Sequence, residues 1–177
     1  YIGSHTSLAL LRHGYEVIVV DNFSNSSLIA LERVQQLAGR KLTIIEIDLC
    51  DHSGLQSVFQ KNPEIESVIH FAALKAVGES TTEPLRYYQN NVGGSIALLG
   101  EMQNAGVHNL VFSSSCTVYG EPETVPLLES HPIGSVSSPY GRTKYMMEGI
   151  IQDHCKANPS WNAAILRYFN PVGADKS

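Results

Sequence analysis

Tyr140 and Lys144 stand four positions apart in the segment SPYGRTKYMME. In an α-helix, residues at i and i+4 share one face, so the phenol and the ammonium group are held close together. Met147 and Ile151 continue this face and are expected to pack inward, which directs the pair toward a sheet. A neighbouring positive charge lowers a tyrosine pKa from its usual value of about 10. We therefore expect Tyr140 to serve as a general base near neutral pH.

A Tyr-x-x-x-Lys spacing alone is weak, because most such pairs are exposed surface pairs. A second feature strengthens it: the apolar run HNLVFSSS ends in Ser113, Ser114 and Ser115, about 25 residues before Tyr140. An apolar strand seldom ends in three serines for packing reasons. We expect Ser115 to hold a substrate hydroxyl while Tyr140 removes its proton, with Lys144 as the partner of the tyrosine.

These residues belong to a regular alternation of apolar β-branched runs and helical patterns. Strands are expected at 16–21, 42–49, 66–73, 108–115 and 162–170, and helices at 4–14, 28–39, 52–61, 83–105 and 138–155. Strand, helix and strand with short connections predict an α/β fold with a Rossmann-like, doubly wound parallel sheet. One long irregular segment, 120–138, is rich in Pro, Ser and Gly, which is typical of a functional or mobile loop.

In an open parallel sheet, ligands bind beyond the carboxyl ends of the strands. Asp21 ends an expected strand eighteen positions after Gly3, where a carboxylate binds the ribose of NAD and repels the 2′-phosphate of NADP. A turn-forming or helix-capping role is the alternative. Asp48 is placed to contact an adenine or to cap the next helix. Lys75 follows small residues and either meets a phosphate or is solvated.

Composition and charge argue against several classes of protein. The chain has 177 residues and a formal net charge of −5, which argues against a nucleic-acid or membrane surface. Apolar runs stay well below the roughly 18 residues that a membrane span needs. Cys50, Cys116 and Cys155 are few and scattered, which predicts neither a disulfide framework nor a metal site and favours a cytoplasmic protein.

A series of long segments carries a resemblance that spans essentially the whole chain. The segments are YIGSHT, VVDNFSNS, VIHFAALKAVGES, YYQNNV, VFSSSCTVYGEP, SPYGRTKYMME and LRYFNPVGA. In this order and spacing they resemble the extended short-chain dehydrogenase/reductase family, and within it the UDP-glucose 4-epimerases. Two positions depart from the family pattern: Ala73 stands where glycine is usual, and Cys116 stands where alanine is usual.

The resemblance implies roles for individual residues. Tyr140 matches the catalytic base, Lys144 its partner, and Ser115 the serine that contacts the sugar 4-hydroxyl. Asn170 matches a further contact to the UDP-sugar. Besides Tyr140 and Lys144, the residues that match NAD contacts are Tyr1, Ile2, Gly3, Asp21, Asn22, Asp48, Leu49, Phe71, Ala72, Ala73, Leu74, Lys75, Asn90 and Phe169.

The implied reaction is the interconversion of UDP-glucose and UDP-galactose in galactose metabolism. NAD takes a hydride from C4, Tyr140 removes the 4-hydroxyl proton, and the 4-keto sugar turns over before the hydride returns. Family members hold NAD tightly. They form homodimers through the two helices expected here at 83–105 and 138–155.

Several alternatives stay open. A nucleotide-sugar 4,6-dehydratase would carry an Asp-Glu pair where this chain has Ser115, Cys116 and Thr117. A sugar-nucleotide decarboxylase and an N-acetylhexosamine epimerase are further possibilities within the superfamily. A non-catalytic nucleotide-binding relative would tend to lose Tyr140 or Lys144, and both are present.

The resemblance also concerns the two ends of the chain. It implies a strand and two glycines before YIGSHT, with Gly3 as the third glycine of a Gly-x-x-Gly-x-x-Gly turn. Ser4 would then begin a helix whose N-terminus faces the pyrophosphate. We expect residues 1–177 to be a truncated NAD-binding domain, followed in the family by a substrate domain, and to be inactive and poorly stable alone.

Overall fold

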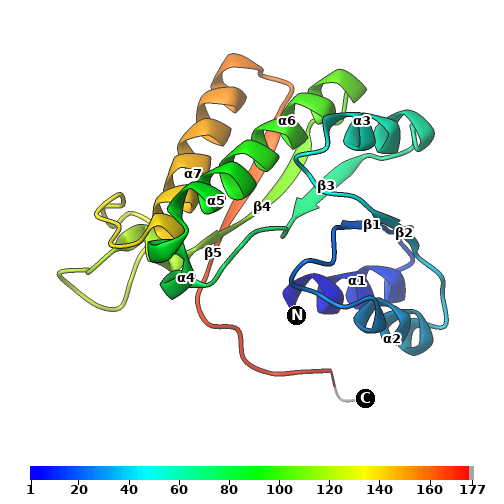
Figure 1. Cartoon of the computed structure of the whole chain (residues 1–177), viewed down its shortest axis with the longest axis horizontal. Helices are drawn as coiled ribbons and strands as arrows, with labels where there is room; N and C mark the ends of the chain where they lie inside the picture. Colours follow the sequence, from blue (N-terminus) through cyan, green and yellow to red (C-terminus); the bar gives the residue numbers. More distant parts are fainter. Residues whose placement is uncertain (176–177) are drawn as a thin grey trace.

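Five short parallel strands form two sheets in the computed structural model, which describes residues 1–175 (Figure 1). β1 (Ile18–Asp21) pairs with β2 (Thr43–Glu46). The second sheet has the order β3 (Ser67–His70), β4 (Asn109–Ser115) and β5 (Asn162–Tyr168). All three strand pairs are parallel, which confirms the predicted α/β class with parallel sheets.

Helices connect the strands and cover them. They are α1 (Ile2–Arg12), α2 (Leu28–Ala38), α3 (His52–Lys61), α4 (Val77–Thr82), α5 (Pro84–Tyr87), α6 (Gly94–Ala105) and α7 (Pro139–Ala157), with a π-helix η1 (Tyr88–Gly93) and a 3-10 helix η2 (Cys116–Tyr119). Figure 1 shows α1 and α2 on one side of the strands and α3, α6 and α7 on the other. Helices on both sides are what a doubly wound sheet requires.

Each sheet has its own apolar core. Leu8 and Leu11 of α1 and Val34 of α2 pack with Leu42 against β1 and β2. The larger core is built from α3, α6, α7 and the second sheet, and its least exposed side chains include Met102, Phe112, Met147 and Ile151. Met147 and Ile151 are each 1% exposed, which confirms that this face of α7 points inward.

The helix predicted over 83–105 is confirmed as one helical run over 84–105, in which α5, the π-helix and α6 follow one another without a break. The short helix α4 precedes this run. Pro84 occupies the first turn of α5, where its missing N–H leaves no helical bond unmade. The π-helix is one turn of wider backbone, a feature found most often at functional sites. It contains Asn91, which is 4% exposed.

Helix termini differ in detail from the predictions. α1 begins at Ile2 and not at Ser4, whose hydroxyl donates to the carbonyl of Tyr1 over 2.9 Å. α3 is capped by Asp51, which accepts from the Gly54 N–H over 3.0 Å, so the capping role considered for Asp48 is wrong. α7 starts as expected, with Pro139 in its first turn and Ser138 accepting from the Gly141 N–H.

The irregular segment 120–138 begins at a position that only glycine fits. Gly120 has φ 64° and ψ −133°, a conformation that a side chain rarely allows. A Cβ built there would lie 2.0 Å from the carbonyl oxygen of Ser135. The Gly134 N–H donates to the Val118 carbonyl over 2.9 Å, so the far end of the segment returns to η2. This loop is therefore held in a defined shape next to the end of β4.

We predict that Gly120→Ala destabilises the protein by about 2–4 kcal/mol, because the new methyl group clashes with backbone and the conformation is strained. Chemical denaturation measures the loss. Gly78→Ala is the matched control, since a Cβ at Gly78 meets nothing within 4 Å and its φ is not positive. Equal stabilities of the two variants would contradict the assignment.

Candidate active site

Parallel pairing brings the strand ends to one edge within each sheet, and the 3.4 Å bond from Asn25 to the Ala73 carbonyl joins the two edges. Asp21 ends β1, Ser115 ends β4, and the segments 48–49, 71–75 and 169–170 follow β2, β3 and β5. Nearly all the residues predicted to bind NAD or substrate therefore lie on these edges, as the strand-end argument required. Tyr1, Ile2 and Gly3 stand at the start of α1, where a Cβ at Gly3 would lie 3.6 Å from the Phe71 ring.

The two aspartates organise the loops after β1 and β2. Asp21 accepts from the Phe23 N–H and from the Ser26 hydroxyl, each over 2.8 Å, so it does form a turn. Asp48 accepts from the Cys50 N–H over 2.8 Å and from the Asn22 amide over 2.6 Å. These bonds, the one from the Cys50 backbone first, hold the pKa of the Asp48 carboxyl below its usual value. The carboxylate is thus ionised and fixed.

Asn91 fixes the segment that follows β3. Its side chain accepts from the Leu74 N–H over 2.8 Å and donates to the Leu74 carbonyl over 2.9 Å. The same amide donates to the hydroxyl of Thr143 on α7 over 3.2 Å. The predicted cofactor segment 71–75 is therefore tied to the helix that carries Tyr140. Lys75 itself is exposed.

Ser115 and Tyr140 meet at the end of β4. Ser115 is 8% exposed, accepts from the Thr117 hydroxyl over 3.0 Å, and lies next to the half-buried Tyr140 phenol. Burial raises the pKa of Tyr140, while the bond with Ser115 lowers it. The expectation that Lys144 lowers this pKa below its usual value is wrong for this structure, because the burial of the phenol outweighs the favourable contacts.

Lys144 is buried beside the same strand end. Its side chain is 5% exposed and its ammonium group donates to the Ser113 carbonyl over 2.8 Å. The ammonium nitrogen also lies 5.0 Å from the centre of the Phe112 ring. Burial lowers the pKa of Lys144 to about 8. The lysine therefore stays mostly protonated at neutral pH and presents a positive charge within the site.

The other predicted residues lie around this centre. Asn90 is half-buried and donates to the Asn91 amide over 2.9 Å. Phe169 and Asn170 are exposed after β5. The neighbouring Tyr168 ring lies 6.5 Å from that of Phe71, so the segments after β3 and β5 adjoin. Ala72 is exposed and Leu74 buried, so only part of 71–75 faces outward.

Three polar residues were not predicted from the sequence: the buried His70 and Glu148, and the half-buried Arg167. His70 is 6% exposed and its Nε2 lies 2.8 Å from the Ser95 hydroxyl. Glu148, on α7, is 1% exposed and pairs with Arg167 over 2.8 Å. Glu148 and Arg167 could have been noticed in the sequence, because Glu148 lies one turn beyond Lys144 and Arg167 interrupts an apolar strand.

Other kinds of site find no support in the described part of the chain. Within residues 1–175, no group of three or more His, Cys, Asp or Glu side chains is placed to hold a metal ion. None of the helices described is long and apolar enough to cross a membrane. The three cysteines, Cys50, Cys116 and Cys155, are free thiols.

Comparison with known proteins identifies the family of this chain. The model of the NAD dependent epimerase/dehydratase family matches residues 1–177. The chain belongs to this family.

Individual relatives are similar over the entire chain. The UDP-glucose 4-epimerase of Erwinia amylovora is 54% identical over 177 residues, which cover 100% of this chain and 52% of the relative. A crystal structure of UDP-glucose 4-epimerase from Bifidobacterium longum in complex with NAD+ and UDP superimposes with a TM-score of 0.97 at 46% identity, covering 99% of this chain and 52% of that one. The UDP-Glc/GlcNAc 4-epimerase from Campylobacter jejuni gives 0.90 at 39% identity, covering 96% and 50%. The chain thus spans about half the length of the relatives it matches.

The buried His70 predicts a pH dependence of stability. Burial, and secondly the charge of Lys144, lowers the pKa of His70 from 6.5 to about 3. The unfolded state binds more protons between these values, so the free energy of unfolding falls as the pH falls below 6.5. The loss from this group amounts to about 2 kcal/mol between pH 6.5 and 5.

We expect His70→Gln, which can still hydrogen-bond Ser95, to lack this part of the pH dependence in denaturant titrations. His5→Gln is the control, because His5 is an exposed histidine on α1. A His70→Gln variant whose stability falls with acid as steeply as that of the parent would contradict a buried neutral histidine.

Proposed function

We propose that the whole protein is an NAD-dependent UDP-glucose 4-epimerase, an isomerase that interconverts UDP-glucose and UDP-galactose through a 4-keto intermediate. The observation that carries the proposal is the cluster at the end of β4, where Ser115 lies next to the half-buried Tyr140 phenol and the buried Lys144 ammonium group donates to the Ser113 carbonyl. Identities of 50–54% to UDP-glucose 4-epimerases over the whole chain support it.

The strand-end residues suit an NAD molecule by their chemistry. Fixed carboxylates at Asp21 and Asp48 suit ribose and adenine, and the short side chains of 72–73 leave room for a close approach. We propose that NAD contacts Tyr1, Ile2, Gly3, Asp21, Asn22, Asp48, Leu49, Phe71, Ala72, Ala73, Leu74, Lys75, Asn90, Tyr140, Lys144 and Phe169. Bound NAD would accept a hydride from sugar C4 and return it.

Side chains of this protein bind the sugar 4-hydroxyl and transfer its proton. Ser115 accepts and donates hydrogen bonds, so it holds the sugar 4-hydroxyl against the phenol of Tyr140. Tyr140 takes the proton of this hydroxyl and gives it back on the other face of the sugar. The buried positive charge of Lys144 stabilises the phenolate that forms during the reaction. Asn170 is proposed to contact the UDP-sugar beyond β5.

We further propose that residues 1–177 form the NAD-binding domain and that a strand preceding Tyr1 completes the sheet. The strand order supports this: β1 and β3 each have a partner on one side only, and no ladder joins them within residues 1–175. A parallel strand between β1 and β3 would give the doubly wound order. We also propose a cytoplasmic location, since the three cysteines are free.

An N-acetylated substrate is the second candidate. The Campylobacter jejuni relative acts on both UDP-Glc and UDP-GlcNAc, as its name states, and is 39% identical. Assays of the whole protein on UDP-galactose and UDP-N-acetylgalactosamine separate the two functions. Turnover of the plain sugar alone would leave the first proposal standing.

We predict that Tyr140→Phe lowers the epimerisation of UDP-galactose by roughly 100-fold or more, because the proton acceptor is lost. Bound NAD, measured after denaturation of the purified protein, should be retained. Tyr145→Phe is the matched control, since Tyr145 is an exposed tyrosine on the same helix. Normal turnover by Tyr140→Phe would refute the assignment of the base.

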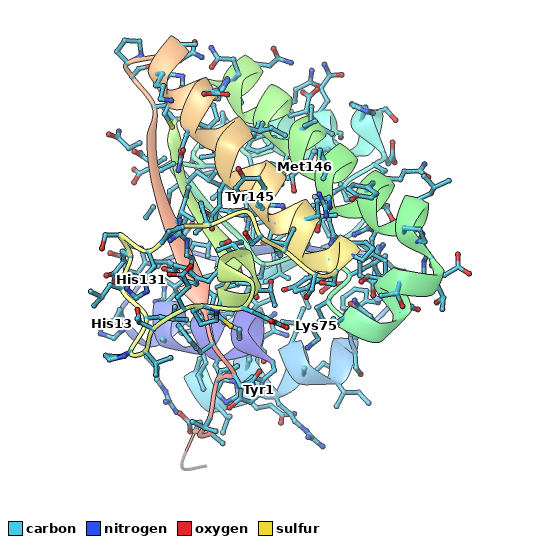
Figure 2. The ribbon with its side chains drawn as sticks, turned by 90° about the vertical axis from the view of Figure 1, so that its left-hand side faces the viewer. Tyr1, His13, Lys75, His131, Tyr145 and Met146 are labelled. Carbon is cyan, nitrogen blue, oxygen red and sulfur yellow. The ribbon has the colours of Figure 1, made fainter. Side chains whose placement is uncertain are left out.

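A homodimer through α6 and α7 is also proposed. Apolar side chains are exposed on both helices: Tyr145 and Met146 on α7 are 39% and 40% exposed, and Ile96 on α6 is 50% exposed. Figure 2 shows Tyr145 and Met146 on the outer side of α7. An apolar face shared by two adjacent helices is a suitable interface for a second copy.

We therefore expect Ile96→Glu combined with Met146→Glu to convert a dimer into a monomer, because two carboxylates would be buried without partners. Sedimentation velocity measures the mass of each species. Val125→Glu, at a 79% exposed site in the 120–138 loop, serves as the control and should leave the dimer intact. A double variant that stays dimeric would exclude this interface.

A further inference from the structure

A buried carboxylate joins α7 to the second sheet two helical turns from Tyr140. Glu148 accepts a 2.5 Å hydrogen bond from the hydroxyl of Ser114 and a 3.0 Å bond from Nε of Arg167 through the same oxygen, Oε1. Its other oxygen, Oε2, accepts from Nη2 of Arg167 over 2.8 Å. The pair is bidentate, the geometry in which a carboxylate and a guanidinium hold each other most rigidly.

The two partners of Glu148 come from neighbouring strands at one level of the sheet. Ser114 of β4 and Arg167 of β5 are paired residues in the parallel ladder. The next residue of β4 is Ser115, which ends the strand and lies next to Tyr140. The Glu148 contact therefore fixes the strand end immediately before the serine of the candidate site.

Arg167 extends the same contact to the adjoining loop. Its Nη1 donates to the Tyr119 hydroxyl over 2.8 Å and to the Glu129 carbonyl over 3.4 Å. The guanidinium carbon lies 4.8 Å from the centre of the Tyr119 ring. Glu148 and Arg167 thus connect α7, β4, β5, η2 and the segment 120–138.

Stability alone does not account for such an arrangement. A buried ion pair contributes little net stability compared with apolar residues of the same size, because both charges lose their hydration. It does, however, define one geometry, since any rotation of the helix would leave the buried charges without partners. Tyr140, Lys144 and Glu148 follow one another at intervals of four residues, so they share one face of α7.

We propose that Glu148, acting through Ser114 and Arg167, is a positioning residue that sets the rotation of α7 against the end of β4 and thereby aligns Tyr140 and Lys144 with Ser115. The expected effect on kcat rests on the proposed epimerase function. Glu148 is not placed in contact with the substrate; it acts only through the geometry of the site.

The first experiment separates positioning from stability in the whole protein. Glu148→Gln keeps the shape of the side chain but loses the bidentate ion pair. We expect kcat for UDP-galactose to fall roughly 10- to 100-fold, because small displacements of reacting groups have effects of this size. The KM for the sugar nucleotide and the amount of bound NAD should change less than about threefold.

A charge-free double variant, Glu148→Leu with Arg167→Met, provides the decisive comparison. Replacing both members of a buried ion pair by apolar residues of similar volume should restore the melting temperature lost in the single variant. Positioning predicts that kcat stays low despite this recovery. If kcat recovers together with the melting temperature, the role of Glu148 is purely structural and the proposal is overturned.

Trp161→Phe is the matched control for lost stability. It removes a buried 2.7 Å hydrogen bond from the indole Nε1 to Gln103, distant along the strands from Ser115, and leaves the Glu148 contacts intact. We expect a lower melting temperature with kcat per folded protein unchanged. A fall in kcat equal to that of Glu148→Gln would also overturn the proposal.

A second readout does not depend on activity and keeps this inference distinct from the proposed function. The ionisation of Tyr140 can be followed by tyrosinate absorbance as the difference between the protein and its Tyr140→Phe variant. Glu148→Gln should raise the pKa of Tyr140, because the bond from Ser115 that lowers it is disturbed. An unchanged titration refutes positioning, whereas an inactive parent protein with a shifted titration refutes only the epimerase function.

Discussion

Parallel strand pairing is the constraint on which this structure depends. Because every strand runs in one direction, its carboxyl end reaches the same edge as the ends of its neighbours. The ladder between β4 and β5 then sets Ser114 beside Arg167 and Ser115 beside Tyr168. The order of groups at the site follows from this register, since a shift of one residue would move every side chain to the other face.

Buried polar groups are the second constraint on how the helices and strands pack. His70, Asn91, Lys144 and Glu148 are each less than 7% exposed, and each has a hydrogen-bonding partner on another element. In a low-dielectric interior a polar group without a partner is costly, so these contacts allow few alternative packings. The helix α7 is the element they share most, and it carries the proposed base.

The two sheets are connected by a few exposed polar contacts, whereas each sheet has its own apolar core. Asn22 bonds Asp48 within the β1–β2 unit, but contact with the larger sheet depends on bonds such as that from Asn25 to the Ala73 carbonyl over 3.4 Å. The ion pair between Arg12 and Asp175 is partly exposed, and such pairs contribute about 0–1 kcal/mol. These contacts join the loops after β1 and β3 and the two ends of the chain, whereas the apolar cores hold each unit together separately.

The sequence by itself determined the alternation of strands and helices, the parallel sheet, and the meeting of Ser115 with Tyr140 at a strand end. These follow from local patterns: apolar runs that end in polar residues, and a four-residue spacing that fixes one helix face. Only the tertiary structure decided that the pKa of Tyr140 is raised, that the helix after Pro84 contains a π-helical turn, and that Glu148 joins Ser114 and Arg167. The reason is physical: burial and hydrogen bonding depend on groups 19 to 34 positions apart in the chain, whose contacts no local periodicity encodes.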